Sequence, residues 1–242
     1  MIGFVVVSHS APLADAAVDL ARQMVHDEAP PVRVAAGAAG GFGTDAAAIA
    51  QAIDELADTD GVLIVTDLGS AVLSSSLALD LRESAVPVRI SDGPFVEGLT
   101  AGIVRAVTGG TLDEVTAEAR RALDAKRQDD VAETGADAAP AAAPVEVAPA
   151  VAVAEVTLVN EVGLHSRPAA SVVKTVGRFD AAVTVTNATS GKGPVSASSL
   201  IGLLSLAAGT GDVLRIAGDG ADAVAAVTAV HDLAADGFGE AA

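Results

Sequence analysis

The sequence predicts two successive domains of different α/β type: a doubly wound, mostly parallel sheet, and then an α+β open-faced sandwich. Three observations support this prediction. Short apolar, β-branched segments alternate with helical patterns through residues 1–130. Residues 131–153 are rich in Ala and Pro and have no amphipathic period. Residues 154–242 then show strand and helix patterns in the order βαββαβα.

The middle stretch is predicted to be a linker. Pro140, Pro144 and Pro149 recur among alanines, a composition typical of a semi-extended connection between domains. Compact domains rarely contain an uncovered loop of this length. The predicted domains are therefore residues 1–130 and residues 154–242, and both have an ordinary domain size.

Composition excludes several classes of protein. The 242 residues carry 14 Lys and Arg against 32 Asp and Glu, a net charge of −18, and they include no Cys, Trp or Tyr. A disulfide framework and a Cys-based metal site are therefore excluded. Nucleic acid is an unsuitable partner, because a basic surface and aromatic platforms are both missing. No apolar run could span a membrane, and the N-terminus lacks a basic signal-peptide segment, so we expect a cytoplasmic protein.

Acidic residues are spread along the chain, and the first domain is the more acidic of the two. Residues 1–130 carry nine basic and 20 acidic side chains, whereas residues 154–242 carry five and nine. Such a surface suits partners with basic docking faces. The alternative is that the charge simply keeps an Ala-rich protein soluble.

The strands of the first domain are continuous apolar runs, as expected for strands buried on both faces. The predicted strands are Ile2–Val7, Val32–Ala35, Gly61–Val65 and Val86–Ile90. The predicted helices are Ala14–Val25, Asp45–Ala57, Ser70–Glu83, Phe95–Val107 and Leu112–Lys126.

Unusual polar residues follow these strands, and the carboxyl ends of parallel strands gather at one edge of a sheet. The first strand leads into Ser8–His9–Ser10, and the third leads into Asp67. A neutral His beside a carboxylate can act as a nucleophile, and glycines and helix N-termini favour an anion. This combination predicts a phosphoryl group carried on His9. The residues expected around that group are Ser10, Gly43, Thr44, Gly69 and Ser70.

Plainer interpretations of the same positions remain open. His9 is also compatible with a turn residue of no function, and Asp45 and Asp67 with simple helix caps. His26, beside Asp27 near a predicted helix end, is interpreted as a solvated side chain.

Four separated segments of the first domain carry a family resemblance. VVVSHSAPLADA, GGFGTDAAAIAQAI, DGVLIVTDLGSAVLSSSLAL and GPFVEGLTAG resemble the DhaM family. Its members are phosphotransferase subunits of bacterial dihydroxyacetone kinases that use phosphoenolpyruvate, and their first domain has the mannose-type EIIA fold. Mannose-type sugar permease subunits tend to have a DxxGGSP-like turn where this sequence has Asp67–Leu68–Gly69–Ser70–Ala71. The resemblance implies that His9 is phosphorylated, that Asp67 orients its ring, and that this domain forms a homodimer.

The second domain is predicted to pair an antiparallel sheet with helices on one face. Its expected strands are Val156–Asn160, Val183–Thr186, Pro194–Ser196 and Asp212–Ala217. Its expected helices are Pro168–Arg178, Ser198–Ala207 and Ala221–Ala235.

The segment Gly163–Ala170 carries the second candidate site. His165 and Ser166 precede a helix whose first turn contains Pro168, where the missing N–H costs little. Amides of that turn, including those of Ser166 and Ala169, point toward a group on His165. Arg167 adds a cation with bidentate geometry for phosphate. A capped helix with a surface His and Arg is the alternative interpretation.

This domain also resembles a known family. NEVGLHSRPAASVVKTVGRFDAAVTV and VSASSLIGLLSLAAGTGD are similar to HPr, the histidine phosphocarrier of the phosphotransferase system. The resemblance implies that enzyme I phosphorylates His165 on Nδ1 with help from Arg167. Ser199 falls at the regulatory serine of some HPr proteins, and we interpret it mainly as a helix-start residue. His231 is interpreted as structural or solvated.

Two departures from the HPr pattern bear on docking. The stretch Asn187–Val195 is a few residues longer than usual, and Ser198 replaces a typical basic residue. Neither departure touches His165.

The sequence therefore predicts a phosphoryl relay, a phosphoenolpyruvate–glycerone phosphotransferase subunit. Enzyme I loads His165, His165 passes the group to His9, and His9 delivers it to ADP on the nucleotide-binding subunit of dihydroxyacetone kinase, which works with a substrate-binding subunit. Phosphoenolpyruvate is the ultimate donor, and we expect no metal, cofactor or nucleotide bound by this chain itself. The sequence ends at Ala242 without an enzyme I-like portion, so a separate enzyme I is expected. Two alternatives remain: a component feeding a mannose-type sugar permease, and a non-catalytic regulator that reports phosphorylation state.

Overall fold

The computed structural model describes residues 1–25, 29–38, 41–123 and 152–239. The chain divides into two compact units, residues 1–123 and residues 124–242. Most of the predicted linker, together with His26 and Gly40, lies outside the described residues. Each unit is treated below by itself.

The first unit is a parallel sheet with helices on both faces, and this confirms the predicted doubly wound class. The strands are β1 (Gly3–Ser8), β2 (Val32–Ala36), β3 (Val62–Thr66) and β4 (Val88–Ile90), in the order β2-β1-β3-β4. The helices are α1 (Ala11–Arg22), α2 (Ala46–Asp54), α3 (Gly69–Leu81), α4 (Phe95–Val107) and α5 (Leu112–Arg120). A 3-10 turn, η2 (Arg121–Leu123), follows α5.

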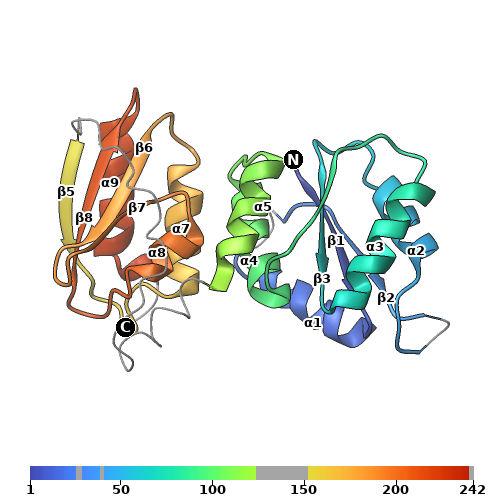
Figure 1. The fold of residues 1–242 in the computed structure, drawn as a ribbon. Helices are drawn as coiled ribbons and strands as arrows, with labels where there is room; N and C mark the ends of the chain where they lie inside the picture. Colours follow the sequence, from blue (N-terminus) through green and yellow to red (C-terminus); the bar gives the residue numbers. More distant parts are fainter. Residues whose placement is uncertain (26–28, 39–40, 124–151, 240–242) are drawn as a thin grey trace, which may run out of the picture. The chain divides into compact units, whose positions relative to one another are not determined.

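Alternate residues of the central strands enter two different cores. Val5, Val7 and Ile64 pack with α2 and α3 on one face of the sheet. On the other face the Phe4 ring lies next to Gly102 of α4, where a Cβ would approach the ring to 3.1 Å. The helices α2 and α3 lie together on one side of β1 and β3 in Figure 1, whereas α4 and α5 lie on the other. Because both faces are covered, the strands are apolar along their whole length.

Several boundaries in this unit differ from the predicted ones, and three of them are described here. The helix α1 begins three residues early, at Ala11, because the Ser10 hydroxyl accepts a hydrogen bond from the Leu13 amide at 3.5 Å. The strand β4 begins at Val88 because Pro87 has no N–H to donate. The helix α5 stops at Arg120, and the last three residues predicted for it lie outside the described part of the chain.

The second unit is an antiparallel sheet with helices on one face, which confirms the predicted open-faced sandwich (Figure 1). The strands are β5 (Ala152–Thr157), β6 (Ala182–Asn187), β7 (Lys192–Ser196) and β8 (Val213–Asp219), in the order β5-β8-β6-β7. The helices are α7 (Ser166–Val176), α8 (Leu200–Ser205) and α9 (Ala223–Ala235), followed by the 3-10 turn η3 (Gly237–Gly239).

The first strand of this unit was placed too late by the sequence pattern. The strand β5 runs from Ala152 to Thr157, not from Val156 to Asn160. Ala152 and Val153, assigned above to the end of the linker, pair with Gly218 and Ala217 of β8. Residues 152 and 153 are held in the sheet by backbone hydrogen bonds, which do not require any particular side chain. A run of small residues shows no alternation of apolar and polar side chains, so the sequence pattern did not predict this start of the strand.

A substitution at Phe4 tests whether the two units fold independently. Phe4 is fully buried, so we expect Phe4→Ala to lower the free energy of unfolding of the first unit by about 3–5 kcal/mol. In urea denaturation followed by residue-resolved NMR, signals from residues 152–239 should keep their midpoint. The matched substitution Leu206→Ala, in a fully buried position of the second unit, should give the opposite pattern. A shared shift of both units would contradict independent folding.

Candidate functional site

The carboxyl ends of β1 and β3 bring His9 and Asp67 together. Val7 and Thr66 are register partners on adjacent parallel strands, so the residues that follow them leave the sheet side by side. Asp67 Oδ1 lies 3.0 Å from His9 Nδ1, and Asp67 Oδ2 accepts the His9 backbone N–H at 2.8 Å. One carboxylate therefore holds both the ring and the backbone of His9.

Further donors fix the Asp67 carboxylate itself. The hydroxyl of Ser8, which is fully buried, donates to Oδ2 at 2.9 Å, and the Leu68 amide donates to Oδ1 at 2.7 Å. Burial by itself raises the pKa of Asp67. The hydrogen bonds from the His9 backbone and ring, the Ser8 hydroxyl and the Leu68 amide outweigh burial, so the pKa lies below its usual value. Asp67 is therefore ionised at neutral pH and can only accept hydrogen bonds.

An ionised acceptor at Nδ1 fixes the tautomer of the His9 ring. Nδ1 carries the proton and donates it to Asp67, which leaves the lone pair on Nε2. The Ser70 hydroxyl lies 2.9 Å from that Nε2. The helix α3, which contains Ser70, begins at Gly69 with no side-chain cap from the described residues. Nε2 thus faces a hydroxyl and the start of a helix, where an anionic group such as a phosphate is favoured.

The loop between β2 and α2 closes the other side of His9. The Gly43 amide donates to the His9 carbonyl at 3.0 Å, and Thr44 Oγ1 lies 2.7 Å from Ser74 Oγ. Both groups therefore hold the loop in place in this structure. Asp45 caps α2 by accepting the Ala47 amide at 2.9 Å, in agreement with the plainer interpretation given above.

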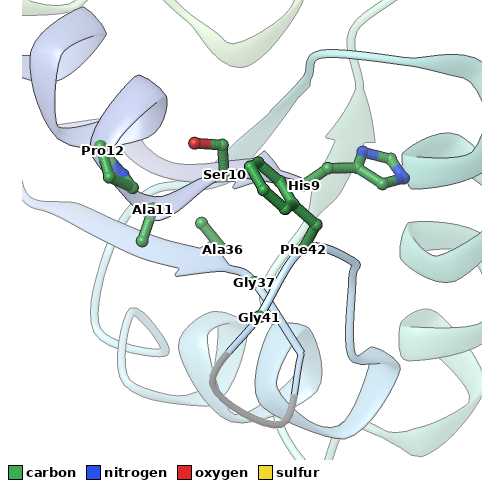
Figure 2. Close-up of a pocket in the computed structure, with 8 residues that line it drawn as sticks. All are labelled: His9, Ser10, Ala11, Pro12, Ala36, Gly37, Gly41 and Phe42. Atoms are coloured by element: carbon green, nitrogen blue, oxygen red, sulfur yellow. The ribbon is translucent and has the colours of Figure 1, made fainter.

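A pocket of about 390 Å³ lies beside His9. Its walls come from the loop after β1, the start of α1 and the loop after β2, as Figure 2 shows. The lining residues are His9, Ser10, Ala11, Pro12, Ala36, Gly37, Gly41 and Phe42.

His165 occupies a helix start in the second unit. It is the residue before α7, its carbonyl accepts the Ala169 amide at 3.0 Å, and Pro168 lies in the first turn as predicted. Ser166 is the first residue of the helix, and the Arg167 side chain is exposed. As with α3, the described residues show no capping hydrogen bond from a side chain at the start of α7, and His165 is the residue that directly precedes its first amides.

The loop that precedes His165 is held by contacts that are remote in sequence. Gly163 has a φ of +76°, and a Cβ there would meet the Ala208 carbonyl at 2.4 Å. Asn160 Nδ2 donates to the Gly163 carbonyl at 2.7 Å, and the Thr210 hydroxyl bonds to the carbonyls of Asn160 and Glu161 at 2.7 and 2.6 Å. These contacts fix the backbone from which His165 projects.

The remaining candidates, Ser199 and His231, make local contacts within the second unit. Ser199 caps α8 by accepting the Gly202 amide at 2.9 Å, as expected for a helix-start residue. His231 lies on α9 with Nδ1 3.0 Å from Asp232 Oδ1. Within the described residues, no group of three or more His, Asp or Glu side chains could hold a metal ion. No helix of that same part of the chain is long and apolar enough to cross a bilayer.

Sequence reasoning missed several positioning residues. Ser8, Ser74, Asn160 and Thr210 were given no role, although each fixes a loop at one of the two histidines. Ser8 is the last residue of β1 and adjoins His9, so its position at the strand end could have identified it from the sequence. The contacts of Ser74 and Thr210 join positions about 30 to 50 residues apart, and no local pattern reveals them.

Comparison with known proteins gives a family match for each of the two units. Residues 3–116 match the family described as PTS system fructose IIA component (EIIA-man), and residues 152–236 match the PTS HPr component phosphorylation site. The chain is 38% identical over 246 residues to the DhaM phosphoryl donor subunit of a dihydroxyacetone kinase that depends on phosphoenolpyruvate (PEP) in Klebsiella michiganensis, and 36% identical over 245 residues to that of Escherichia coli. The chain belongs to the DhaM family.

The alignments with these DhaM proteins cover 99% of this chain and 51% of each relative. The chain thus spans about half the length of the curated relatives that it matches. A second form of DhaM, from Listeria innocua, is 29% identical over 120 residues, which is 49% of this chain and 96% of that protein. DhaM relatives therefore match either the whole of this chain or about half of it.

Removing the charge of Asp67 tests the role of this carboxylate at the first site. In Asp67→Asn the charge that holds the proton on Nδ1 is lost, so both tautomers of His9 become populated. We expect the rate of phosphorylation at His9 to fall about 10²- to 10⁴-fold while the fold is kept. The ¹⁵N shifts of the His9 ring should report the mixed tautomers directly. An unchanged rate in a folded variant would contradict the assigned role of Asp67, and Asp45→Asn, at a helix cap of the same unit, is the matched control.

Proposed function

We propose that this chain is a two-step phosphoryl carrier of the PEP-dependent phosphotransferase system that serves a dihydroxyacetone kinase. Enzyme I charges His165, His165 passes the phosphoryl group to His9, and His9 delivers it to ADP on the nucleotide-binding subunit of the kinase. The main support is the line of Asp67, His9 and Ser70, in which Nδ1 faces a carboxylate at 3.0 Å and Nε2 faces a hydroxyl at 2.9 Å. The matches to an EIIA-man family and an HPr family in one chain, and to phosphoryl donor subunits of PEP-dependent dihydroxyacetone kinases, support a phosphoryl carrier that serves such a kinase.

The assignment of atoms follows from the tautomer of His9. Nε2 of His9 attacks the phosphorus atom, the bond to Nδ1 of His165 breaks, and the electron pair returns to that nitrogen. His9 keeps its Nδ1 proton, which the Asp67 carboxylate stabilises as the ring gains positive character. No proton has to move between the two rings. In the next step an oxygen of the ADP β-phosphate attacks, and the electron pair of the broken N–P bond returns to Nε2.

The protein contributes position and charge to these transfers, because phosphoryl transfer between nitrogen and oxygen nucleophiles needs in-line alignment above all. Ser70 and the start of α3 are proposed to hold the phosphoryl oxygens on His9. Arg167 and the first amides of α7, with Ser166, are proposed to hold those on His165. Ser10, Gly43, Gly69, Thr44 and Ala169 are proposed to shape these two sites through their backbones and hydrogen bonds.

Two alanine variants test the relay. In a mixture of PEP, enzyme I, the kinase subunits and dihydroxyacetone, His9→Ala should abolish formation of dihydroxyacetone phosphate. His165→Ala should abolish it as well, and added free HPr should restore it by charging His9 directly. His231→Ala, outside both sites, is the matched control and should leave the rate unchanged. A His165→Ala protein that works unaided would refute the order of transfer, and an active His9→Ala protein would refute the relay.

We also propose that the first unit forms a homodimer through α3. Leu73, Leu77 and Leu81 are spaced four residues apart, so they form one stripe along the helix, and all three side chains are exposed. Asp80 is the single charged residue between Gly69 and Leu81, in a unit whose sequence is strongly acidic. Two copies can therefore approach along this helix with little charge repulsion, and the same stripe on each copy suits a two-fold interface.

A charge introduced into the leucine stripe of α3 tests whether this stripe forms the dimer interface. Leu77→Glu places a carboxylate at the centre of the stripe, so we expect the dimer to dissociate and the mass from light scattering to halve. Leu20→Glu introduces the same change at an exposed position of α1 and should remain dimeric. A native chain that is monomeric at micromolar concentration, or a dimer that survives Leu77→Glu, would contradict this interface.

A further inference from the structure

The side chains of Asp67, His9 and Ser70 form a continuous hydrogen-bonded line. Asp67 Oδ1 lies 3.0 Å from His9 Nδ1, and Ser70 Oγ lies 2.9 Å from His9 Nε2. Exposure to solvent rises along this line, since the side chain of Asp67 is 8% exposed, that of His9 is 24% exposed, and Ser70 is an exposed residue. A buried carboxylate, a partly covered imidazole and an accessible hydroxyl, each within hydrogen-bond reach of the next, have the arrangement of a serine hydrolase triad.

The tautomer of His9 sets the direction of the hydrogen bond to Ser70. Asp67 is ionised and accepts the Nδ1 proton, so Nε2 carries a lone pair and the Ser70 hydroxyl donates to it. The Ser70 proton therefore points at a base, while the lone pairs of Oγ stay available on an exposed side chain. A serine hydroxyl is a weak nucleophile by itself, and a base at this distance activates it for attack on an electrophilic carbon.

The fold places Ser70 where negative charge is stabilised. The strand β3 ends at Thr66, and Ser70 is the second residue of α3, whose start shows no capping hydrogen bond from a side chain of the described residues. The first amides of a helix have no partner within the helix, and they favour an anion. An oxyanion that forms on a group bonded to Ser70 is therefore next to the positive end of this helix.

We propose that the chain with an unphosphorylated His9 hydrolyses short-chain carboxylic esters, with Ser70 as nucleophile, His9 as general base and Asp67 as the group that orients His9. Because Ser70 is exposed, the site suits a small acyl group that needs little apolar burial. The activity uses side chains of the first site, but it requires no phosphoryl donor and no partner. It therefore stands or falls independently of the relay proposed above.

The acylation step follows from these positions. Ser70 Oγ forms a bond to the carbonyl carbon of the ester, its proton passes to His9 Nε2, and the carbonyl electron pair moves onto the carbonyl oxygen. When that oxygen re-forms its double bond, the bond from carbon to the alcohol oxygen breaks. The alcohol oxygen keeps the electron pair and takes the proton from Nε2. Asp67 stays ionised throughout and stabilises the imidazolium between the two proton transfers.

Water completes the reaction at the same base. Nε2 takes a proton from a water molecule as its oxygen attacks the acyl carbon, and the proton then passes to Ser70 Oγ as the acyl bond breaks. A carboxylic acid leaves and the hydroxyl is regenerated. A phosphoryl group on Nε2 would occupy the lone pair that both steps need. A single chain can therefore carry phosphoryl on His9 or hydrolyse an ester at Ser70, but not both at once.

Hydrolysis of p-nitrophenyl acetate by the full-length, unphosphorylated chain tests this proposal. Ser70→Ala should lower the second-order rate constant about tenfold or more, and His9→Ala should lower it to the same level. The double variant should be no slower than either single variant, because a nucleophile and its base act as a unit. After an acid quench, peptide mass spectrometry should find the acetyl group on Ser70.

Two matched controls account for background reactivity. Ser76→Ala removes another exposed hydroxyl of α3, one that donates to the Val72 carbonyl at 3.0 Å. His231→Ala removes an imidazole of the second unit that is 38% exposed, and so measures hydrolysis by a surface histidine. Both variants should keep the native rate. Unchanged unfolding midpoints for all variants will exclude a loss of fold.

The outcomes separate this inference from the relay. If Ser70→Ala keeps the native rate while His9→Ala loses it, the His9 ring itself is the nucleophile and the proposal is wrong. A native rate no higher than that of His9→Ala would also overturn it. Ester hydrolysis with acetyl on Ser70 would support the proposal even if no phosphoryl group reaches His9. A working relay without ester hydrolysis would leave the relay intact and refute this inference alone.

Discussion

The carboxylate of Asp67 is the group on which the first site depends. It accepts the His9 backbone amide, the His9 ring, the Ser8 hydroxyl and the Leu68 amide, so it joins the ends of two neighbouring strands. A partly buried carboxylate is costly unless such donors surround it, and here they keep it ionised. The charge then favours the proton on Nδ1 and leaves the lone pair on Nε2. A single ionised group thus sets both the position and the tautomer of His9.

The two histidine sites reach a similar chemistry by different construction. His165 lies at a helix start, within the eight-residue segment Gly163–Ala170. His9 depends on Asp67 and Ser70, which both follow β3, and on Gly43, which comes from the loop between β2 and α2. Both sites place a histidine next to the first amides of a helix that lacks a side-chain cap within the described residues. An anion carried on either ring would complete that helix start.

Several exposed apolar side chains of this protein lie at positions that suit contact with other molecules. The sequence is acidic overall, yet the leucine stripe of α3 and Phe42 beside His9 keep large apolar side chains in water. On an acidic protein, such patches are where a second surface can approach without strong repulsion. The backbone around Phe42 is tied by hydrogen bonds, so this side chain is presented without the entropy cost of ordering a loop on binding.

The sequence by itself determined the fold class of both units, most of their helices and strands, and the two histidines as candidates. It could do so because periodicity, strand-end position and the Gly163–Ala170 segment are local properties of the chain. It misplaced the start of β5, since Ala152 and Val153 are held by backbone pairing and show no side-chain pattern. Only the tertiary structure decided which nitrogen of His9 faces Asp67 and which faces Ser70, that Ser8 and Thr210 fix the two sites, and that Phe42 faces water. Each of these depends on atoms brought within about 3 Å by chain segments distant in sequence, and hydrogen bonds of that length are set by packing rather than by local sequence.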